Sequence, residues 1–367
     1  MELKSRKPAV LLLEDGSVFE GVSLGKIGIA TGEICFNTGM TGYQEIYTDP
    51  SYFGQIIINT SSHIGNYGTI EEEQESNLPQ INGVIINEYS EMYSRSNSEE
   101  SLEEYFIKNN TVSIYDIDTR KLVKHIRDKG AMNAIISSDI LELKKLKTIL
   151  NGVPQMKNLE LSSHVTTKKE YIYGDEKSNL KVAVLDLGCK RSILKNFSDR
   201  GVLCKVFPAK TSFEKMQGWK PDGYFISNGP GDPASMDYAV NTVKEIIKND
   251  KPVFGICLGH QILARACDVS TYKLHNGHRG INHPVKNLSS GKSEVTSQNH
   301  GFGVSMEEIK ESTSLELTHI NLNDDTVEGI KVKGKKAFSV QYHPESSPGP
   351  HDSRYLFDDF INMIKSE

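Results

Sequence analysis

A regular alternation of apolar strands and amphipathic helices begins at residue 181 and limits the folds open to this part of the 367-residue chain. Short β-branched runs are expected as strands at 181–188, 204–209, 222–229 and 253–257. Helices are predicted between them at 191–201, at a short segment where Thr211 and Glu214 fit a capping box, and from Met236 to Ile247. This pattern calls for a mostly parallel sheet with right-handed crossovers, in a doubly wound α/β domain.

The first 150 residues do not keep this alternation. Short β-like segments with many glycines predominate there, and one clear helix is expected at 119–130. We therefore predict a separate mixed, β-rich amino-terminal domain over 1–150, a polar linker over 151–180, and the α/β domain over 181–367.

Charge and cysteine usage exclude several classes of function. A net charge of −6 argues against nucleic acid or an anionic membrane as the main partner. The apolar run near the start ends at Glu14 and Asp15 and is too short for a signal peptide, and no segment has the length of a membrane span. Five scattered cysteines without a CxxC pair indicate neither a disulfide framework nor a zinc site, so we expect a cytoplasmic protein with reduced thiols and no metal.

The segment GICLGHQ (255–261) raises the question of whether Cys257 is a nucleophile or a buried thiol. Glycines flank Cys257 two residues away on each side, as in a strand-to-helix nucleophile elbow, and a helix amino terminus favours the thiolate. Most free cysteines are small buried hydrophobes, and this second interpretation is applied to the other four. The local pattern alone leaves both interpretations of Cys257 open.

A possible base for this nucleophile follows the last apolar strand, in QYHPE (341–345). His343 and Glu345 are two residues apart, so they point to the same face of an extended chain. Pro344 favours that extended geometry at His343. An imidazole with an orienting carboxylate is the usual partner of a cysteine nucleophile.

Four motifs together resemble the class I glutamine amidotransferases, whose triad is Cys–His–Glu: SNGPGDP (227–233), GICLGHQ (255–261), QNHGF (298–302) and QYHPE (341–345). Two further segments narrow the likeness to the small subunits of carbamoyl-phosphate synthetases, HRGINHPV (278–285) and HPESSPGPHD (343–352). The amino-terminal half supports that choice through FNTGMTGYQEIYTDPSYFGQIII (36–58), SHIGNYG (62–68) and DIDTRKLVKHIRDKGAMN (116–133), which resemble the domain that precedes the glutaminase in this family.

The resemblance implies that Cys257 attacks the side-chain amide of L-glutamine and forms a γ-glutamyl thioester, with His343 as acid and base and Glu345 as its orienting group. The backbone N–H groups of Leu258 and Gly229 would hold the oxyanion. The residues implied to contact glutamine are Ser51, Gly229, Gly231, Leu258, Gln261, Asn299, Gly301 and Phe302. His260, His283 and His300 lie in motifs without a spacing that demands catalysis, and they are expected to be structural.

The same resemblance implies a partner, since the chain has no phosphate-binding GxxxxGK[ST] loop. A large synthetase subunit would receive ammonia and would carry the ATP and metal ions, so no cofactor is expected in this chain. The expected assembly is a heterodimer, alone or within a larger complex, that serves arginine synthesis, pyrimidine synthesis or both. Two alternatives stay open: a regulatory subunit without activity, and a stand-alone hydrolase of γ-glutamyl compounds.

Overall fold

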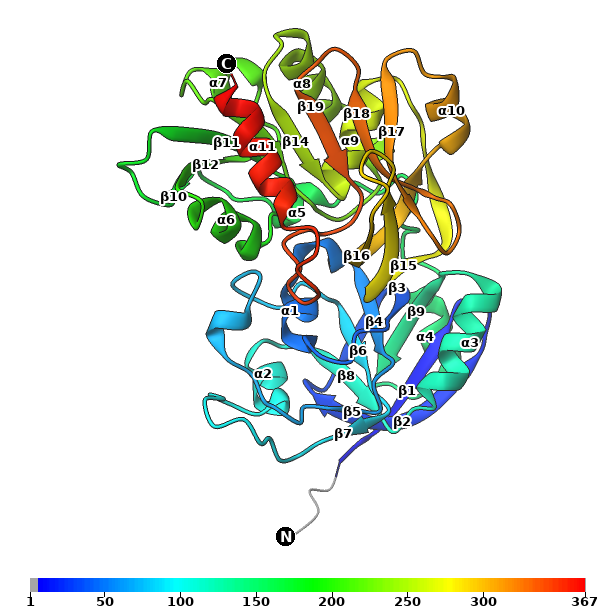
Figure 1. Ribbon diagram of the computed structural model, residues 1–367. Helices are drawn as coiled ribbons and strands as arrows, with labels where there is room; N and C mark the ends of the chain where they lie inside the picture. The colour runs from blue at the N-terminus through cyan, green and yellow to red at the C-terminus, as the bar shows by residue number, and fades with distance from the viewer. Residues whose placement is uncertain (1–5, 367) are drawn as a thin grey trace. The chain divides into compact units, whose positions relative to one another are not determined.

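The computed structural model describes residues 6–366 and divides into two compact units, one ending at Met156 and one starting at Lys157 (Figure 1). Residues 157–180, expected from the sequence as a linker, contribute helix α5 and strand β10 to the second unit. Among the described residues, no helix combines the length and the apolar character needed to cross a bilayer.

The first unit contains a closed barrel in the strand order β1-β2-β8-β6-β4-β3-β9, which agrees with the predicted β-rich domain. Its strands are β1 (Pro8–Leu13), β2 (Val18–Gly25), β3 (Ile29–Asn37), β4 (Gln55–Asn59), β6 (Gly83–Ile85), β8 (Val112–Tyr115) and β9 (Asn133–Ser137), with a small separate pair β5 (His63–Ile64) and β7 (Glu88–Tyr89). Its helices are α1 (Tyr43–Thr48), α2 (Leu102–Lys108), α3 (Thr119–Lys129) and α4 (Leu143–Leu150).

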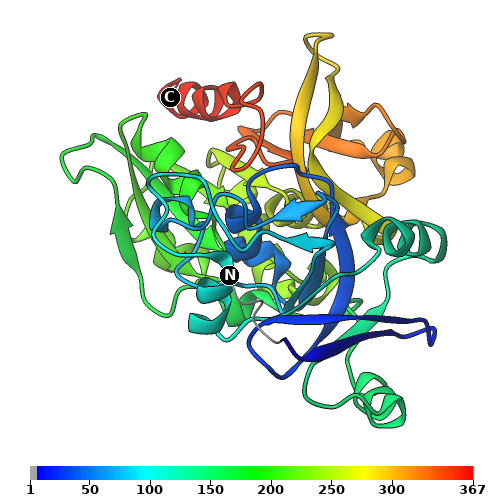
Figure 2. The ribbon, with the colours of Figure 1, turned by 90° about the horizontal axis from the view of Figure 1, so that it is seen from below.

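Alternation along β4 shows how this barrel packs. Ile56 and Ile58 belong to one apolar cluster, whereas Ile57 belongs to a second cluster with residues of α1 and α2. The helix expected at 119–130 is confirmed as α3, whose amino end is capped by Asp118. In Figure 2 helices α3 and α4 lie outside the blue and cyan strands.

The second unit is built on one ten-stranded sheet in the order β10-β12-β11-β13-β14-β19-β18-β17-β15-β16. Its strands are β10 (Tyr171–Tyr173), β11 (Leu180–Asp186), β12 (Val202–Pro208), β13 (Gly223–Ile226), β14 (Val253–Ile256), β15 (Thr271–Asn287), β16 (Ser293–Val304), β17 (Leu315–Asn321), β18 (Val327–Val332) and β19 (Ala337–Val340). Its helices are α5 (Ser162–Val165), α6 (Arg191–Ser198), α7 (Phe213–Gln217), α8 (Asp237–Lys248), α9 (Leu258–Ala266), α10 (Met306–Glu311) and α11 (Tyr355–Lys365).

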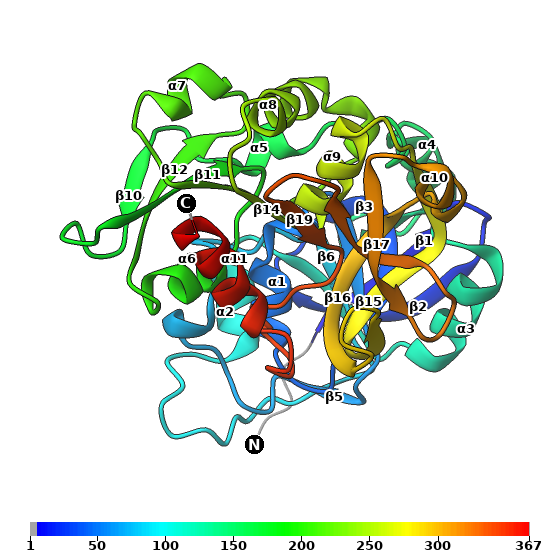
Figure 3. The same ribbon diagram turned by 45° about the horizontal axis from the view of Figure 1, so that its top comes forward.

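The predicted strands form the parallel centre of this sheet, where β12, β11, β13, β14 and β19 pair in parallel. Side chains of β11 alternate between the two faces: Val182 and Val184 pack in the cluster of α6 and α11, while Ala183 and Leu185 pack in that of α8 and α9. Figure 3 shows these two helix pairs on opposite sides of the sheet. The doubly wound α/β class is therefore confirmed.

The structure differs from the sequence prediction at the start of α7. Ser212, not Thr211, is the N-cap, and its hydroxyl accepts a hydrogen bond from the backbone N–H of Lys215. The backbone N–H of Thr211 instead closes a turn onto the carbonyl of Pro208, and Thr211 lies one residue before the N-cap. The predicted Thr211–Glu214 capping box is thus wrong by one residue.

Candidate active site

Cys257 lies at the sharp turn between strand β14 and helix α9. Its backbone has φ 55° and ψ −103°, a conformation that is rare for a residue with a side chain and costs about 1–3 kcal/mol. The residue is the N-cap of α9, yet its side chain makes no capping hydrogen bond. This strained strand-to-helix turn is the geometry of a nucleophile elbow, which presents the thiol at the carboxyl end of a central strand.

The elbow packs so closely that two glycines have no room for a side chain. A Cβ atom on Gly259 would lie 2.1 Å from the carbonyl oxygen of Ile226, and one on Gly229 would lie 2.1 Å from that of Leu187. The same Cβ on Gly229 would be 3.0 Å from Cδ2 of Leu258. The loop that carries Gly229 therefore lies beside the residue that follows the cysteine.

His343 and Glu345 form a buried pair near the end of β19. Nδ1 of His343 is 2.7 Å from Oε1 of Glu345, and the two residues are 1% and 0% exposed. Because a carboxylate only accepts hydrogen bonds, Nδ1 carries the hydrogen and Nε2 is left for chemistry. Nε2 is buried, and Cys257 interacts with the His343 ring through charge and hydrogen bonding, while the thiol of Cys257 also donates to the carbonyl of Asn299 at 3.5 Å.

The charges of this site shift two pKa values strongly. Burial would lower the pKa of His343, but the charges on Glu345 and Cys257 outweigh burial and raise the pKa to about 10. Burial would raise the pKa of Glu345, but Lys190 and His343 outweigh burial and lower it to about 2. The pair is therefore an imidazolium and a carboxylate at neutral pH, and the imidazolium interacts electrostatically with Cys257.

Lys190 is a member of the site that the sequence reasoning missed. Its Nζ donates to Oε1 of Glu345 at 2.9 Å and to the carbonyl of Ser347 at 2.6 Å, and the lysine is 3% exposed. A buried lysine is rare unless it is paired. The signal available in the sequence was its position, since Lys190 lies in the loop after the carboxyl end of β11 and Cys257 directly follows the carboxyl end of β14.

Two other cysteines of the second unit have the environment of packed thiols. Burial raises the pKa of Cys204, and burial followed by the charge of Asp268 raises that of Cys267 to about 11. Neither residue stands at a strained turn with positive φ. These environments favour a packing role for both.

Three of the implied glutamine contacts gather beside α9. Gln261 is 3% exposed, and its Nε2 donates to the carbonyl of Phe302 at 2.9 Å and to Oε1 of Gln341 at 3.1 Å. Asn299 lies in β16 next to Cys257 through the thiol-to-carbonyl contact. The segment 299–302 therefore lies against both ends of the first turn of α9.

The other implied contacts occupy separate positions. Gly231 lies in the loop after β13, where it has φ 94° and forms a β-bridge with Glu160. Gly301 lies in β16, and a Cβ atom added to it would be 3.1 Å from the Nζ of Lys273.

Ser51 belongs to the first unit, in a short 3₁₀ turn where its backbone N–H donates to Oδ1 of Asp49 at 2.9 Å. It is 5% exposed.

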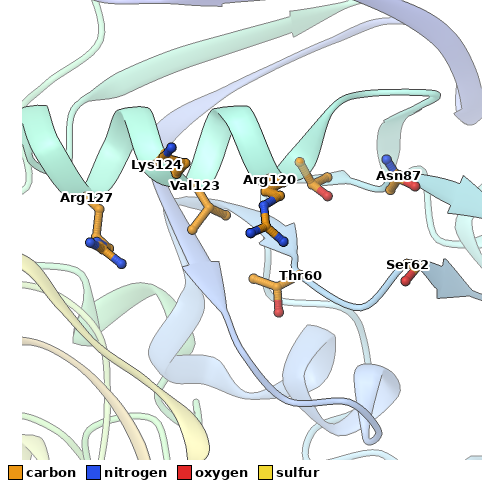
Figure 4. A pocket seen from close by; sticks show the side chains of 8 residues that line it. Thr60, Ser62, Asn87, Arg120, Val123, Lys124 and Arg127 are labelled. Atoms are coloured by element: carbon orange, nitrogen blue, oxygen red, sulfur yellow. The ribbon is translucent and has the colours of Figure 1, made fainter.

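A basic pocket of about 580 Å³ lies in the first unit along helix α3 (Figure 4). Arg120, Lys124 and Arg127 contribute its cations, and none of them forms an ion pair with another residue in 6–366. The remaining lining residues are polar or small: Thr60, Ser62, Asn87, Thr119 and Val123. The pocket offers positive charge and hydroxyl groups without a carboxylate.

Two family models match the chain, one in each unit. The model described as carbamoyl-phosphate synthase small chain, CPSase domain, matches residues 11–136. The model described as glutamine amidotransferase class-I matches residues 183–363. The second match includes Cys257, His343 and Glu345.

Curated relatives match over nearly the full length. A carbamoyl phosphate synthase small chain from Chlorobaculum tepidum is 46% identical over 98% of this chain and 98% of its own. Those from Aquifex aeolicus and Vibrio vulnificus are also 46% identical, over 98% of this chain and 100% and 98% of their own. At this identity and coverage the chain belongs to the carbamoyl-phosphate synthase small chains, and it is a glutamine-hydrolysing enzyme chain with a class I glutamine amidotransferase domain.

Proposed function

We propose that this chain hydrolyses L-glutamine to glutamate through a γ-glutamyl thioester on Cys257 and passes the ammonia to a large synthetase subunit. The observation that carries the proposal is the strained Cys257 turn beside the buried His343–Glu345 pair. A thiolate next to an imidazolium is the activated form of a cysteine nucleophile. Cysteine-dependent amide hydrolysis uses these two groups in both of its steps.

In the first step the sulfur of Cys257 attacks the side-chain carbonyl carbon of glutamine, and the carbonyl oxygen becomes an oxyanion. The backbone N–H groups of Leu258 and Gly229 stabilise that oxyanion, supported by the close approach of their two segments. His343 then gives its Nε2 proton to the departing nitrogen, so that the carbon–nitrogen bond breaks, ammonia leaves and a thioester remains.

In the second step His343 takes a proton from water, and the resulting hydroxide adds to the thioester carbon. The carbon–sulfur bond breaks, glutamate leaves and the thiolate of Cys257 is restored. Glu345 holds the His343 ring in one tautomer throughout, because its carboxylate accepts from Nδ1. This chemistry consumes one water and requires no cofactor in this chain.

We assign the glutamine backbone groups to Gly231, Gln261, Asn299, Gly301 and Phe302, and the family resemblance adds Ser51. The grouping of Gln261 with the 299–302 segment beside Cys257 supports this assignment. Polar groups that fix a substrate by hydrogen bonds can discriminate strongly against analogues that lack the matching group.

The partner in this proposal is the large subunit, which makes carbamoyl phosphate from bicarbonate, ammonia and ATP and holds the ATP and its metal ions. The small-chain names of the curated relatives support such a partner. We propose a cytoplasmic heterodimer, alone or within a higher assembly, whose product enters arginine or pyrimidine synthesis. Nucleic acid and membrane play no part in this function.

The test is glutamate release from glutamine by the purified chain, alone and with the large subunit, in the wild type and in Cys257→Ser. We expect slow hydrolysis alone, a large increase with the partner, and loss of at least 10³-fold in the variant, since a neutral serine hydroxyl replaces a far better nucleophile. Cys267→Ser, at the other end of the same helix, is the matched control and should keep full activity. Undiminished hydrolysis in Cys257→Ser would contradict the mechanism, and absence of association with a large subunit would contradict the assembly.

A further inference from the structure

Two imidazoles and a carboxylate meet in the antiparallel part of the second unit's sheet. His278 lies in β15, His300 in β16 and Glu328 in β18, and each can offer one ligand atom such that all three atoms lie within 4.8 Å of one another. His278 and His300 are directly opposite in the β15–β16 ladder, which places their side chains on one face of the sheet. Their ring centroids are 4.9 Å apart, with the rings perpendicular.

His300 presents a buried lone pair to this cluster. Its Nδ1 is 2.8 Å from the carbonyl oxygen of Phe302, and since a carbonyl only accepts, Nδ1 carries the hydrogen. Nε2 is therefore an acceptor, and it is buried without a hydrogen-bond partner among the described residues. The residue is 5% exposed, and leaving such a group unsatisfied is costly.

The other two side chains are held in place from outside the cluster. Nε2 of His278 is 2.9 Å from Oδ2 of Asp324, which leaves Nδ1 of His278 turned towards Glu328, 3.8 Å from its Oε1. Glu328 is 0% exposed, and its two oxygens accept from Asn321 at 2.8 Å and from Gln298 at 2.9 Å. Carboxylate, carbonyl and amide partners of this kind are the outer shell that orients ligands in protein metal sites.

We propose that His278, His300 and Glu328 bind one divalent transition-metal ion, with zinc as the best match. Two imidazole nitrogens and one carboxylate oxygen form a donor set that zinc uses with a fourth position open to water. Ligand atoms around a tetrahedral zinc lie about 3.3 Å apart, so binding requires shifts of roughly 1 Å or less in these side chains. Asp324 is partly exposed, which gives the ion a route from solvent.

The bound ion joins strands β15, β16 and β18, and its ligand His300 lies on the same strand as Asn299 and Phe302. Its ligands are scattered over the sequence positions 278, 300 and 328, without the short spacings that identify zinc sites in a sequence. Only the pairing of β15 with β16 and the turn from β17 into β18 bring them together. The structural role expected of His300 would then be to hold a metal ion that links these strands.

The test titrates the chelator-treated full chain with Co²⁺ and then Zn²⁺, in a Cys257→Ala background so that the active-site thiol cannot bind the metal. We expect one Co²⁺ per chain, with visible d–d absorption and no near-ultraviolet thiolate band, displacement by one Zn²⁺, and a higher unfolding temperature with metal. His278→Gln and Glu328→Gln should each weaken Zn²⁺ binding by at least about 100-fold. His275→Gln, an exposed histidine on the same strand, is the matched control and should bind as the parent does.

Asp324→Asn keeps all three ligands and changes only the outer partner of His278, so it tests the site even where Glu328→Gln fails to fold. We expect a loss of Zn²⁺ affinity of about 10-fold or more with an unchanged circular dichroism spectrum. Absence of stoichiometric binding in the Cys257→Ala chain would overturn the proposal, as would a thiolate band. Affinity that is unaffected by both His278→Gln and Asp324→Asn would also overturn it.

Discussion

Lys190 controls the charge state of Glu345 in the buried His343–Glu345 pair. Its Nζ contacts a carboxylate that is completely buried, and it is the largest favourable influence on the pKa of Glu345. Removing one partner of a buried ion pair destabilises a fold by more than the intact pair stabilises it, because the remaining charge is left buried and unpaired. The ammonium group of Lys190 therefore helps to keep Glu345 ionised.

Replacing Lys190 with methionine should destabilise the fold by about 3–5 kcal/mol, because Glu345 loses its buried counter-ion. In the wild type, the lowered pKa of Glu345 contributes stability above about pH 4.5 that is lost as the pH falls towards 2. In Lys190→Met the pKa of Glu345 rises, so this loss starts at higher pH. Urea unfolding between pH 3 and 7 measures both effects.

Lys190→Met should also shift the acid side of the pH–rate profile of glutamine hydrolysis to higher pH. The reason is that a protonated Glu345 no longer accepts the hydrogen bond from Nδ1 of His343. Lys190→Arg, which keeps the charge, should recover part of the stability and most of the pH profile. A Lys190→Met chain with unchanged stability and an unshifted acid limb would show that the ion pair is inconsequential.

His343 should be an imidazolium well above neutral pH, because Glu345 and Cys257 raise its pKa to about 10. Nitrogen-15 NMR of the histidine side chains measures this directly, since a protonated ring has two equivalent pyrrole-like nitrogens. In Cys257→Ser the contribution of the cysteine to the raised pKa of His343 is lost, so the midpoint should fall. A wild-type midpoint near 6.5, or one that is the same in the serine variant, would contradict the coupling.

The turn from β14 into α9 depends on a close approach between elements. We expect Gly259→Ala to destabilise the chain by about 1–3 kcal/mol, because its Cβ would overlap the carbonyl oxygen of Ile226 and push α9 away from β13. Glutamine hydrolysis should fall as well, since Cys257 moves with the start of the helix. Thermal unfolding and glutamate release are the two measurements.

Gly218→Ala, at the end of helix α7, is the control for this substitution, because its Cβ would have only ordinary contacts at 3.4 and 3.5 Å and its φ is −58°. It should change the free energy of unfolding by less than about 0.5 kcal/mol. Equal losses of unfolding free energy in the two variants would show that the close packing at Gly259 contributes no more to stability than an ordinary glycine position does.

Sequence periodicity correctly predicted strands that are buried on both faces and helices that are buried along one side. The strand at 181–188 and the helix at 119–130 were predictable because their apolar patterns match β11 and α3. The antiparallel extension β18-β17-β15-β16 was not, because its alternation is interrupted by polar side chains and by register shifts in β15 and β17. Such strands form because of pairing between segments that are far apart in the sequence, and a single sequence does not reveal that pairing.

The same distinction applies to the candidate site. Cys257, His343 and Glu345 could be named because each stands next to a recognisable strand end, and His343 and Glu345 are neighbours in the chain. Lys190 reaches Glu345 from 155 positions away, and the His278–His300–Glu328 cluster combines three strands. Contacts of this kind follow from sheet order, which local patterns do not fix.

Across the whole chain, the distribution of charge suggests where a large subunit docks. The chain carries a net charge of −6, yet helix α3 of the first unit directs Arg120, Lys124 and Arg127 into one pocket without acidic neighbours in its lining (Figure 4). Complementary charge mainly speeds association and selects the partner. We therefore expect an acidic surface of the large subunit to contact this helix.

The variant Arg120→Glu/Lys124→Glu tests this expectation against Lys144→Glu/Lys147→Glu, which makes the same change of charge on exposed positions of α4. The α3 variant should associate with the large subunit about 10-fold more slowly at low salt, and the difference should shrink as salt screens the charges. Surface plasmon resonance at several ionic strengths measures both rates. Because net charge is matched, slower association in the α3 variant alone assigns the effect to this pocket, whereas an equal effect of the two variants would assign it to overall charge.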